Sequence, residues 1–265
     1  MFIDTHAHLW WPTYVEDLDE VLARAKVAGV NQIVVPGTDI ESSKKAIELA
    51  KKYPGFLYAA VGIHPEETIT ESFKVRPSLA SSGWALPLRS DLRELITKNR
   101  EQVVAIGEIG IDLYTPQVQA TLEQQKSLFK IQLELANELD LPVIIHTRNS
   151  FPETWEVLSS LSRMPRGQFH CFSVDEEALS QVITAGFYTS FCANITWSKR
   201  VAKLVEHVPD DRLLLETDSP FMAPKSRNEP AQVAMLATKI GELRSTATEK
   251  IGEMTIVNAK RLYRL

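Results

Sequence analysis

The sequence is poor in cysteine, in long apolar runs and in positive charge. Its 265 residues include two cysteines, Cys171 and Cys192, which are too few for a disulfide framework and favour a reducing compartment. The longest apolar runs, such as Phe56 to Ile63, fall far short of the roughly 18 residues that indicate a membrane span. The formal net charge of -5 excludes a uniformly basic protein that coats nucleic acid. We therefore expect a soluble, cytoplasmic protein without a membrane partner.

The sequence also shows no internal repeat, and we expect no removable leader. A candidate functional residue, His6, already stands at position six, which leaves no room for a leader. The composition, 44% hydrophobic and 24% charged, is that of an ordinary globular protein. Apart from one stretch, Phe73 to Ser90, which we interpret as a surface excursion rich in proline and serine, no segment interrupts the chain. The whole of 1–265 is therefore predicted to be a single domain.

Short apolar runs alternate with amphipathic helical stretches along the whole chain. The predicted strands are Met1 to His6, Asn31 to Pro36, Phe56 to Gly62, Val103 to Glu108, Leu141 to His146, Gln168 to Phe172, Gly186 to Phe191 and Arg212 to Glu216. The predicted helices between and after them are Val15 to Ala28, Ile40 to Lys52, Gln117 to Leu139, Asp175 to Ala185, Ser198 to His207 and Glu229 to Arg244. Alternating units of this kind imply a buried parallel sheet. Eight units in about 250 residues match an α/β protein with a closed (β/α)8 TIM barrel.

A last helix is predicted to close the chain after these units. Thr246 and Glu249 have the spacing of a capping box, and periodic apolar positions follow them. The prediction is therefore a barrel with a C-terminal closing helix.

Six side chains of metal-ligating types stand at or just beyond strand ends: His6, His8, Glu108, His146, His170 and Asp218. In a barrel the carboxyl ends of the strands converge on one face, so these side chains are expected to meet. A lone histidine is more often a hydrogen-bonded structural residue than a ligand, but several histidines in one small space predict a metal centre. His6 and His8, two residues apart, can point to the same side of a strand. Imidazole pairs favour Zn²⁺ or Mn²⁺ over Mg²⁺.

The two carboxylates of this set are predicted to be catalytic as well as ligating. A glutamate such as Glu108 at the end of a buried strand is costly unless it is paired or bound to a cation, and one carboxylate can bridge two cations. The alternative for Glu108 is an ion pair with Arg148. Asp218 can bind a metal and also accept a proton from the attacking water. Asp4 is expected to orient a liganding imidazole, and Glu216 to have a supporting or structural role.

Several short strings carry a resemblance that covers nearly the whole chain. They are FIDTHAHL at 2–9, VGIHP at 61–65, IGEIGID at 106–112, LPVIIHTR at 141–148, FHCFS at 169–173, LLLETDSP at 213–220 and RNEP at 227–230. In their order and spacing they resemble the TatD family of metal-dependent deoxyribonucleases. The resemblance implies a (β/α)8 barrel that binds two divalent cations and hydrolyses phosphodiester bonds in DNA.

The resemblance also implies a role for each matching residue. One cation would be held by His6, His8 and Asp218, the other by His146 and His170, and Glu108 would bridge them. Beside the metals, His64 and Arg148 could meet the substrate phosphate. Arg227 is a further candidate for substrate binding, because it is a cation near Asp218 in the sequence and could extend the positive field along DNA. For His64 the alternative is a loop or helix-start histidine braced by Pro65.

Some positions depart from the family pattern or have an alternative explanation. Val174 stands where glycine is common after FHCFS, and the shortened stretch after Asp218 leaves Lys225 and Arg227 as its cations. Basic residues that can extend a positive field along DNA, or simply form a solvated helix face, are Lys199, Arg200 and Lys203. Aromatic residues that can stack on a base, or serve as lid packing, are Trp10, Trp11 and Phe221.

Three functions remain open from the sequence. The first is a metal-dependent deoxyribonuclease in which two divalent cations, Mg²⁺, Mn²⁺ or Zn²⁺, activate a water for attack on the phosphodiester bond. We expect it to act exonucleolytically on single-stranded DNA, because a deep barrel mouth admits a flexible strand more readily than a duplex. The second is an amidohydrolase-type enzyme that cleaves a small-molecule ester or amide, or an aminoacyl-tRNA ester. The third is a noncatalytic binding protein, which the complete ligand set disfavours. No protein partner is predicted.

Overall fold

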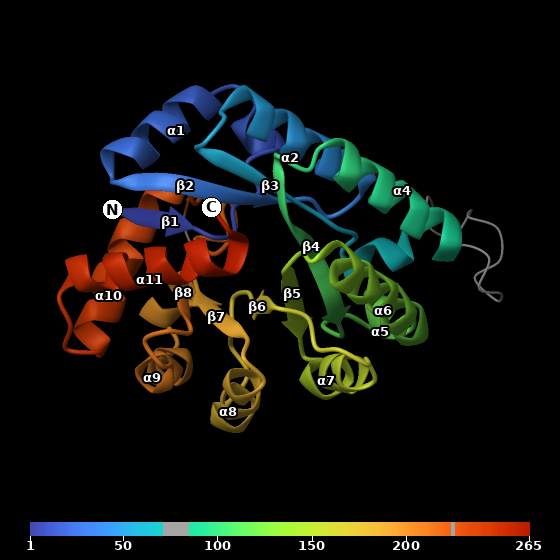
Figure 1. Ribbon diagram of the computed structural model, residues 1–265. Helices are drawn as coiled ribbons and strands as arrows, with labels where there is room; N and C mark the ends of the chain where they lie inside the picture. The colour runs from blue at the N-terminus through green and yellow to red at the C-terminus, as the bar shows by residue number, and fades with distance from the viewer. Residues whose placement is uncertain (71–84, 224–225) are drawn as a thin grey trace.

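The computed structural model describes residues 1–70, 85–223 and 226–265. In this part of the chain the strands form an eight-stranded sheet in sequential order, and each strand pairs in parallel with the next (Figure 1). The strands are β1 (Phe2–Asp4), β2 (Val30–Pro36), β3 (Leu57–Val61), β4 (Val103–Asp112), β5 (Val143–Arg148), β6 (Gly167–Phe169), β7 (Tyr188–Phe191) and β8 (Leu213–Leu215). All eight were predicted, with shifted ends.

The two edges of the sheet meet between β8 and β1. The backbone N–H of Thr5 donates to the carbonyl of Leu215 at 3.0 Å, and Ala7 forms a parallel bridge with Ser219. The sheet is thus a nearly closed barrel, and the predicted (β/α)8 architecture is confirmed.

Helices surround the barrel (Figure 1). They are α1 (Leu18–Val27), α2 (Ile40–Lys52), α4 (Ala85–Lys98), α5 (Pro116–Gln119), α6 (Leu122–Leu139), α7 (Phe151–Ser159), α8 (Glu176–Thr184), α9 (Lys199–His207), α10 (Val233–Leu243) and α11 (Thr248–Tyr263). In α9, for example, Val201, Leu204 and Val205 are buried, which is the spacing of one helix face. Short 3-10 helices η1 (Pro12–Tyr14), η2 (Pro65–Ile69), η4 (Ala193–Thr196) and η5 (Pro230–Gln232) lie in the connections.

Some sequence predictions about the helices are wrong. Two helices, α4 and α7, were not predicted, because each has a proline near its start, Pro87 and Pro152, which resembles a loop but fits a first helical turn. The predicted excursion Phe73 to Ser90 lies mostly in 71–84, outside the described residues, and its last residues begin α4. The predicted helix Gln117 to Leu139 is divided into α5 and α6.

The last helix covers the end of the barrel where the strands begin. The Asn258 amide donates to the carbonyls of Asp210 and Leu213, just before and at the start of β8, and Gly252 packs against Met1. The predicted closing helix is therefore present, but its capping box is wrong. The N-cap is Ala247, and the Thr246 hydroxyl donates to the Arg244 carbonyl instead.

None of the helices among the described residues combines the length and the apolar character that crossing a membrane requires.

Candidate metal centre

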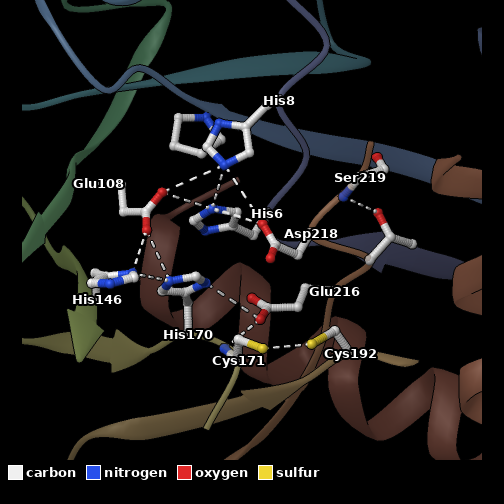
Figure 2. Close-up of polar contacts among 12 residues, drawn as sticks. His6, His8, Glu108, His146, His170, Cys171, Cys192, Glu216, Asp218 and Ser219 are labelled. Atoms are coloured by element: carbon white, nitrogen blue, oxygen red, sulfur yellow. Dashed lines mark hydrogen bonds and ion pairs between the residues drawn. The ribbon is translucent and has the colours of Figure 1, made fainter. Parts of the chain in front are cut away.

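All six predicted ligands lie together at the carboxyl ends of the strands (Figure 2). His6 and His8 follow β1, Glu108 and His146 stand within β4 and β5, and His170 and Asp218 follow β6 and β8. His6 is fully buried, and His8, Glu108 and His170 are nearly so. The fold therefore places four histidines and two carboxylates in one small, largely buried volume at the carboxyl ends of the strands, as the parallel barrel requires.

One half of the centre consists of His6, His8 and Asp218 together with one oxygen of Glu108. The Nε2 atoms of His6 and His8 are 3.1 Å apart. They lie 3.2 and 3.4 Å from Glu108 Oε2. They also lie 3.7 and 3.6 Å from Asp218 Oδ1. Four donor atoms thus surround one point.

The other half consists of His146 and His170 with the second oxygen of Glu108. His146 Nδ1 and His170 Nε2 are 3.2 Å apart, and each lies 2.9 Å from Glu108 Oε1. Glu108 therefore directs one oxygen into each half, which is the arrangement of a bridging carboxylate.

The donor atoms have the spacing that a bound divalent cation needs. With metal–nitrogen and metal–oxygen bonds of about 2.0 to 2.2 Å, neighbouring ligand atoms lie about 3.0 to 3.6 Å apart. The separations in both halves, from 2.9 to 3.7 Å, agree with this range to within about 0.1 Å. The residues therefore fit divalent metals.

The electrostatics of the centre keep Glu108 ionised. Burial by itself would raise the pKa of this carboxyl, but the surrounding histidines, His170 foremost, hold it well below its usual range. Burial opposes protonation of His170 too, but Glu108 and Glu216 raise its pKa well above the ordinary value. For His6, burial prevails and lowers the pKa, which favours the neutral imidazole that binds metals.

Asp112, which was not predicted from the sequence, orients one of the candidate ligands. Its Oδ2 lies 2.9 Å from His146 Nε2, so that Nε2 carries the proton and Nδ1 faces Glu108. The predicted strand ended at Glu108, whereas β4 continues to Asp112. The alternation Glu108, Gly110, Asp112 on one strand face was the signal that could have shown it. Gly110 is required here, because a Cβ would lie 1.9 Å from the His146 carbonyl oxygen.

Two other buried acids, Glu216 and Asp4, have different hydrogen-bond partners. Glu216 Oε1 lies 3.6 Å from His170 Nδ1 and accepts the Cys171 N–H, which agrees with a supporting role. Asp4 was expected to orient an imidazole, and this expectation is wrong. Its carboxylate accepts the backbone N–H of His6 and both the N–H and the hydroxyl of Thr217. Asp4 therefore ties the segment after β1 to the segment after β8.

His64 combines the two roles considered for it. It is the N-cap of η2, where its Nδ1 accepts the Glu66 N–H at 3.2 Å. The proton must then lie on Nε2, which is 3.4 Å from Glu108 Oε1. His64 is thus a hydrogen-bond donor toward the centre.

The two predicted arginines occupy different surroundings. Arg148 stacks on Tyr114, with its guanidinium carbon 3.5 Å from the ring centroid, and 46% of its side chain is exposed. Its nearest carboxylate is Asp112 at 4.0 Å, so the alternative pairing with Glu108 does not occur. Arg227 donates instead to both oxygens of Asp17 and to Glu229, away from the metal ligands.

The centre opens into a cavity of about 310 Å³. Candidate metal ligands line this cavity together with Arg148, His64 and a wall of aromatic rings. The lining residues are His8, Trp11, Thr38, His64, Glu66, Glu67, Glu108, Asp112, His146, Arg148, His170, Asp218 and Phe221. In the wall, the rings of Trp11 and Phe221 meet edge to face at 5.0 Å. Trp10 lies behind, with its indole N–H bonded to the Pro36 carbonyl.

Those of the other predicted cations that the structure describes lie apart from this cavity. Lys203 pairs with Glu176 at 2.6 Å on the outer helices, as a solvated helix face would. Lys225 lies outside the described residues.

Comparisons with known proteins agree with this centre. Residues 3–264 match the family model described as TatD related DNase. A relative from Bacillus subtilis, the uncharacterized metal-dependent hydrolase YabD, is 37% identical and each chain is covered completely. A relative from Pectobacterium atrosepticum, named 3'-5' ssDNA/RNA exonuclease TatD, is 31% identical, with 99% of each chain covered.

Solved structures have the same architecture. The TatD homologue YJJV of Escherichia coli is 30% identical, with a TM-score of 0.86 over 100% of this chain and 98% of that one. A TatD family hydrolase from Entamoeba histolytica is 25% identical, with a TM-score of 0.86 over 99% and 97% of the two chains.

Proposed function

Because the chain belongs to the family of TatD-related DNases, a family of metal-dependent hydrolases, we propose that it is an exonuclease that hydrolyses single-stranded DNA with two divalent cations. The polarity that we propose, from the 3′ end, is the one in the names of its exonuclease relatives.

One observation carries this proposal: the two carboxylate oxygens of Glu108 face two different groups of donor atoms. A single cation could use only one of these groups, whereas a pair would use all six ligand residues. The chemistry that such a pair supplies when bound is Lewis-acid activation of a water and of a phosphate oxygen.

The remaining steps belong to side chains of this chain. Asp218 keeps its pKa below the ordinary value despite burial, because His8 and His6 lie against it. As an ionised carboxylate it can accept the proton of the attacking water at Oδ2, since Oδ1 faces the imidazoles. The Nε2–H of His64 and the guanidinium of Arg148 line the cavity as donors for the phosphate.

The size of the cavity supports a single strand as the substrate. Ligand pockets range from about 300 to 1,000 Å³, so a cavity of about 310 Å³ stands at the small end. It suits one nucleotide unit rather than a duplex. Trp11 and Phe221 on its wall offer ring surfaces against which the base of that unit can pack.

The experiment is hydrolysis of single-stranded DNA labelled at the 5′ end, by metal-stripped protein that is reloaded with Mg²⁺, Mn²⁺ or Zn²⁺. We expect a ladder of labelled fragments that shorten progressively from the 3′ end. The Glu108→Gln variant should lose at least about a hundredfold in rate, because it removes the charge shared by both halves. A variant of an exposed residue outside the cavity, Lys203→Ala, should cleave normally.

Blunt duplex DNA, single-stranded RNA and a model ester serve as parallel substrates. Cleavage of the ester with no cleavage of any nucleic acid, by protein shown to bind two cations, would contradict the nuclease and favour the amidohydrolase alternative. Immediate release of the labelled 5′ nucleotide would reverse the proposed polarity.

A further inference from the structure

A pair of cysteines lies next to the candidate metal centre, and the proposed mechanism does not use it. Cys171 stands two residues after β6 and Cys192 directly after β7. Both thiols are free, and their Sγ atoms are 2.6 Å apart. Figure 2 shows the two sulfurs side by side, with Cys171 adjacent to Glu216 and His170. Cys171 is partly exposed, whereas Cys192 is fully buried.

The barrel itself brings the two cysteines together. β6 and β7 are parallel neighbours, and beyond their paired residues the Phe172 N–H still donates to the Ser190 carbonyl at 2.9 Å. To form a disulfide, the two Sγ atoms need to approach only from 2.6 Å to about 2.05 Å. A bond between the two sulfurs therefore needs only a local movement of the segments that follow β6 and β7.

A shared soft metal ion is the competing use of the same residues. Cys171, Cys192 and Glu216 each offer a ligand atom within 4.8 Å of the others. Zinc–sulfur bonds of about 2.3 Å in a tetrahedral site would hold two sulfurs about 3.8 Å apart. The observed separation is shorter by more than an ångström, and the Glu216 oxygens already accept the Cys171 N–H and the Ser190 hydroxyl. The geometry favours a bond between the sulfurs over a common cation.

We propose that Cys171 and Cys192 are a peroxide-sensitive dithiol that closes to a disulfide and thereby lowers the activity of the neighbouring centre. Hydrogen peroxide oxidises the accessible Cys171 thiol to a sulfenic acid and is itself reduced to water. The Cys192 sulfur then attacks the Cys171 sulfur, the S–S bond forms, and the S–O bond breaks with release of a second water. Two thiols and one peroxide thus give one disulfide and two waters.

The link to the centre runs through the backbone of Cys171. Its N–H donates to Glu216 Oε1 at 2.5 Å, and this same oxygen lies 3.6 Å from His170 Nδ1. His170 is also the preceding residue in the chain. When the Cys171 side chain is drawn to Cys192, the peptide between His170 and Cys171 shifts, and the ligand ring shifts with it. This consequence rests on the proposed function, whereas the disulfide does not.

The test treats reduced, metal-loaded protein with a small excess of hydrogen peroxide. Peptide mapping without reductant should find one peptide pair that joins Cys171 to Cys192 and is lighter by two hydrogen atoms than the separate peptides. DNA hydrolysis should fall by about tenfold, in the range of changes around metal ligands. Dithiothreitol should restore both the free thiols and the rate.

Cys192→Ser is the matched variant, because Cys192 is not a candidate metal ligand and, within the described residues, its side chain hydrogen-bonds to Cys171 alone. Reduced Cys192→Ser should cleave DNA as the unchanged protein does, and should keep its rate at the same peroxide dose. An equal loss in this variant would overturn the link to the centre. If both thiols can still be alkylated after peroxide treatment, the proposed disulfide does not form. If the reduced protein binds an additional cation that Cys192→Ser does not bind, the two cysteines are a metal site and the proposal is wrong. Protein that never cleaves DNA would refute the proposed function, while the mapping would still decide the dithiol.

Discussion

At the scale of single residues, the hydrogen bond between Asp112 and His146 determines which imidazole nitrogen faces the centre. The aspartate is buried, and its pKa stays below the ordinary value despite that burial, because the hydrogen bond and the charge of His146 hold it ionised. Its other oxygen accepts the Tyr114 N–H at 2.7 Å, so the carboxylate cannot rotate freely. An ionised, fixed acceptor keeps the proton on His146 Nε2 and leaves Nδ1 to bind a cation.

We predict that Asp112→Asn lowers metal affinity or DNA hydrolysis by about 10- to 100-fold. The substituted amide can donate as well as accept, so it no longer selects one tautomer of His146. Calorimetric titration of metal-stripped protein with Mn²⁺ measures the affinity directly. Asp211→Asn is the matched control, because Asp211 is exposed and its ion-pair partner among the described residues is its neighbour Arg212. Equal affinity in Asp112→Asn and the control would show that the carboxylate does not orient the ligand.

The sequence contained the candidate ligands of the centre but not all of the residues that contact them. Strand ends are visible as apolar runs that stop at a histidine or a carboxylate, which is why His146 and Glu108 could be predicted. Asp112 lay beyond the predicted end of its strand. Glycine alternates with the other residues there, so the face of the strand that points into the barrel was not recognised. Arg227 was expected at the substrate because it is a cation near Asp218 in sequence. Its actual partners, Asp17 and Glu229, become neighbours only when the barrel closes.

At the scale of elements, Arg227 joins the start of α1 to the segment that follows β8. Its guanidinium binds both oxygens of Asp17 and one of Glu229, and it lies 4.8 Å from the centroid of the Tyr14 ring. Arg24 of α1 in turn binds Glu229 with two hydrogen bonds of 2.8 Å. This network holds the connections on both sides of the seam where the sheet closes.

We predict that Arg227→Ala lowers the melting temperature by a few degrees at pH 7, and by less below about pH 4. The hydrogen bond from Arg227 lowers the pKa of Asp17 in the folded protein. A depressed pKa contributes stability that is fully present above the unfolded value of about 3.9 and is lost as the pH falls through the folded value. Thermal unfolding at a series of pH values measures the effect. Arg227→Lys serves as a second variant, because it keeps the positive charge but loses the planar guanidinium that can bind a carboxylate with two hydrogen bonds. A difference in melting temperature between the unchanged protein and Arg227→Ala that grows as the pH falls would contradict a stabilising role for this network.

Helices and strands were predicted well where the sequence pattern indicates one type of element, and poorly where a proline stands near the start of a helix. The strand runs are β-branched and apolar, and their helices follow at regular intervals. In α7, Pro152 occupies the first turn, where a missing N–H is harmless, so the sequence resembles a loop although the structure continues as a helix. The length of β6, three residues from Gly167 to Phe169, depends on hydrogen bonds to its neighbours and is not encoded in its own residues.

At the scale of the whole molecule, the candidate metal ligands lie on both sides of the place where the barrel closes. In the described residues the contacts between the segments of β1 and β8 include the Thr5–Leu215 hydrogen bond and the Ala7–Ser219 bridge. His6 and His8 lie on one side of this seam and Asp218 on the other. A cation that binds all three therefore binds the closed barrel and not the unfolded chain, so binding and folding are coupled.

We predict that saturating Mn²⁺ raises the melting temperature of metal-stripped protein by about 5 to 10 °C. A ligand at about 100 times its dissociation constant adds about 2.7 kcal/mol, and each kcal/mol shifts a protein of this size by about 2 to 4 °C. The shift should grow with the logarithm of the metal concentration and disappear on chelation. In Glu108→Gln the two halves of the centre lose their common ligand, so its shift should be much smaller, whatever its melting temperature without metal. A large, equal shift in both proteins would mean that the stabilising cation binds elsewhere, and the centre would then hold no metal that matters for folding.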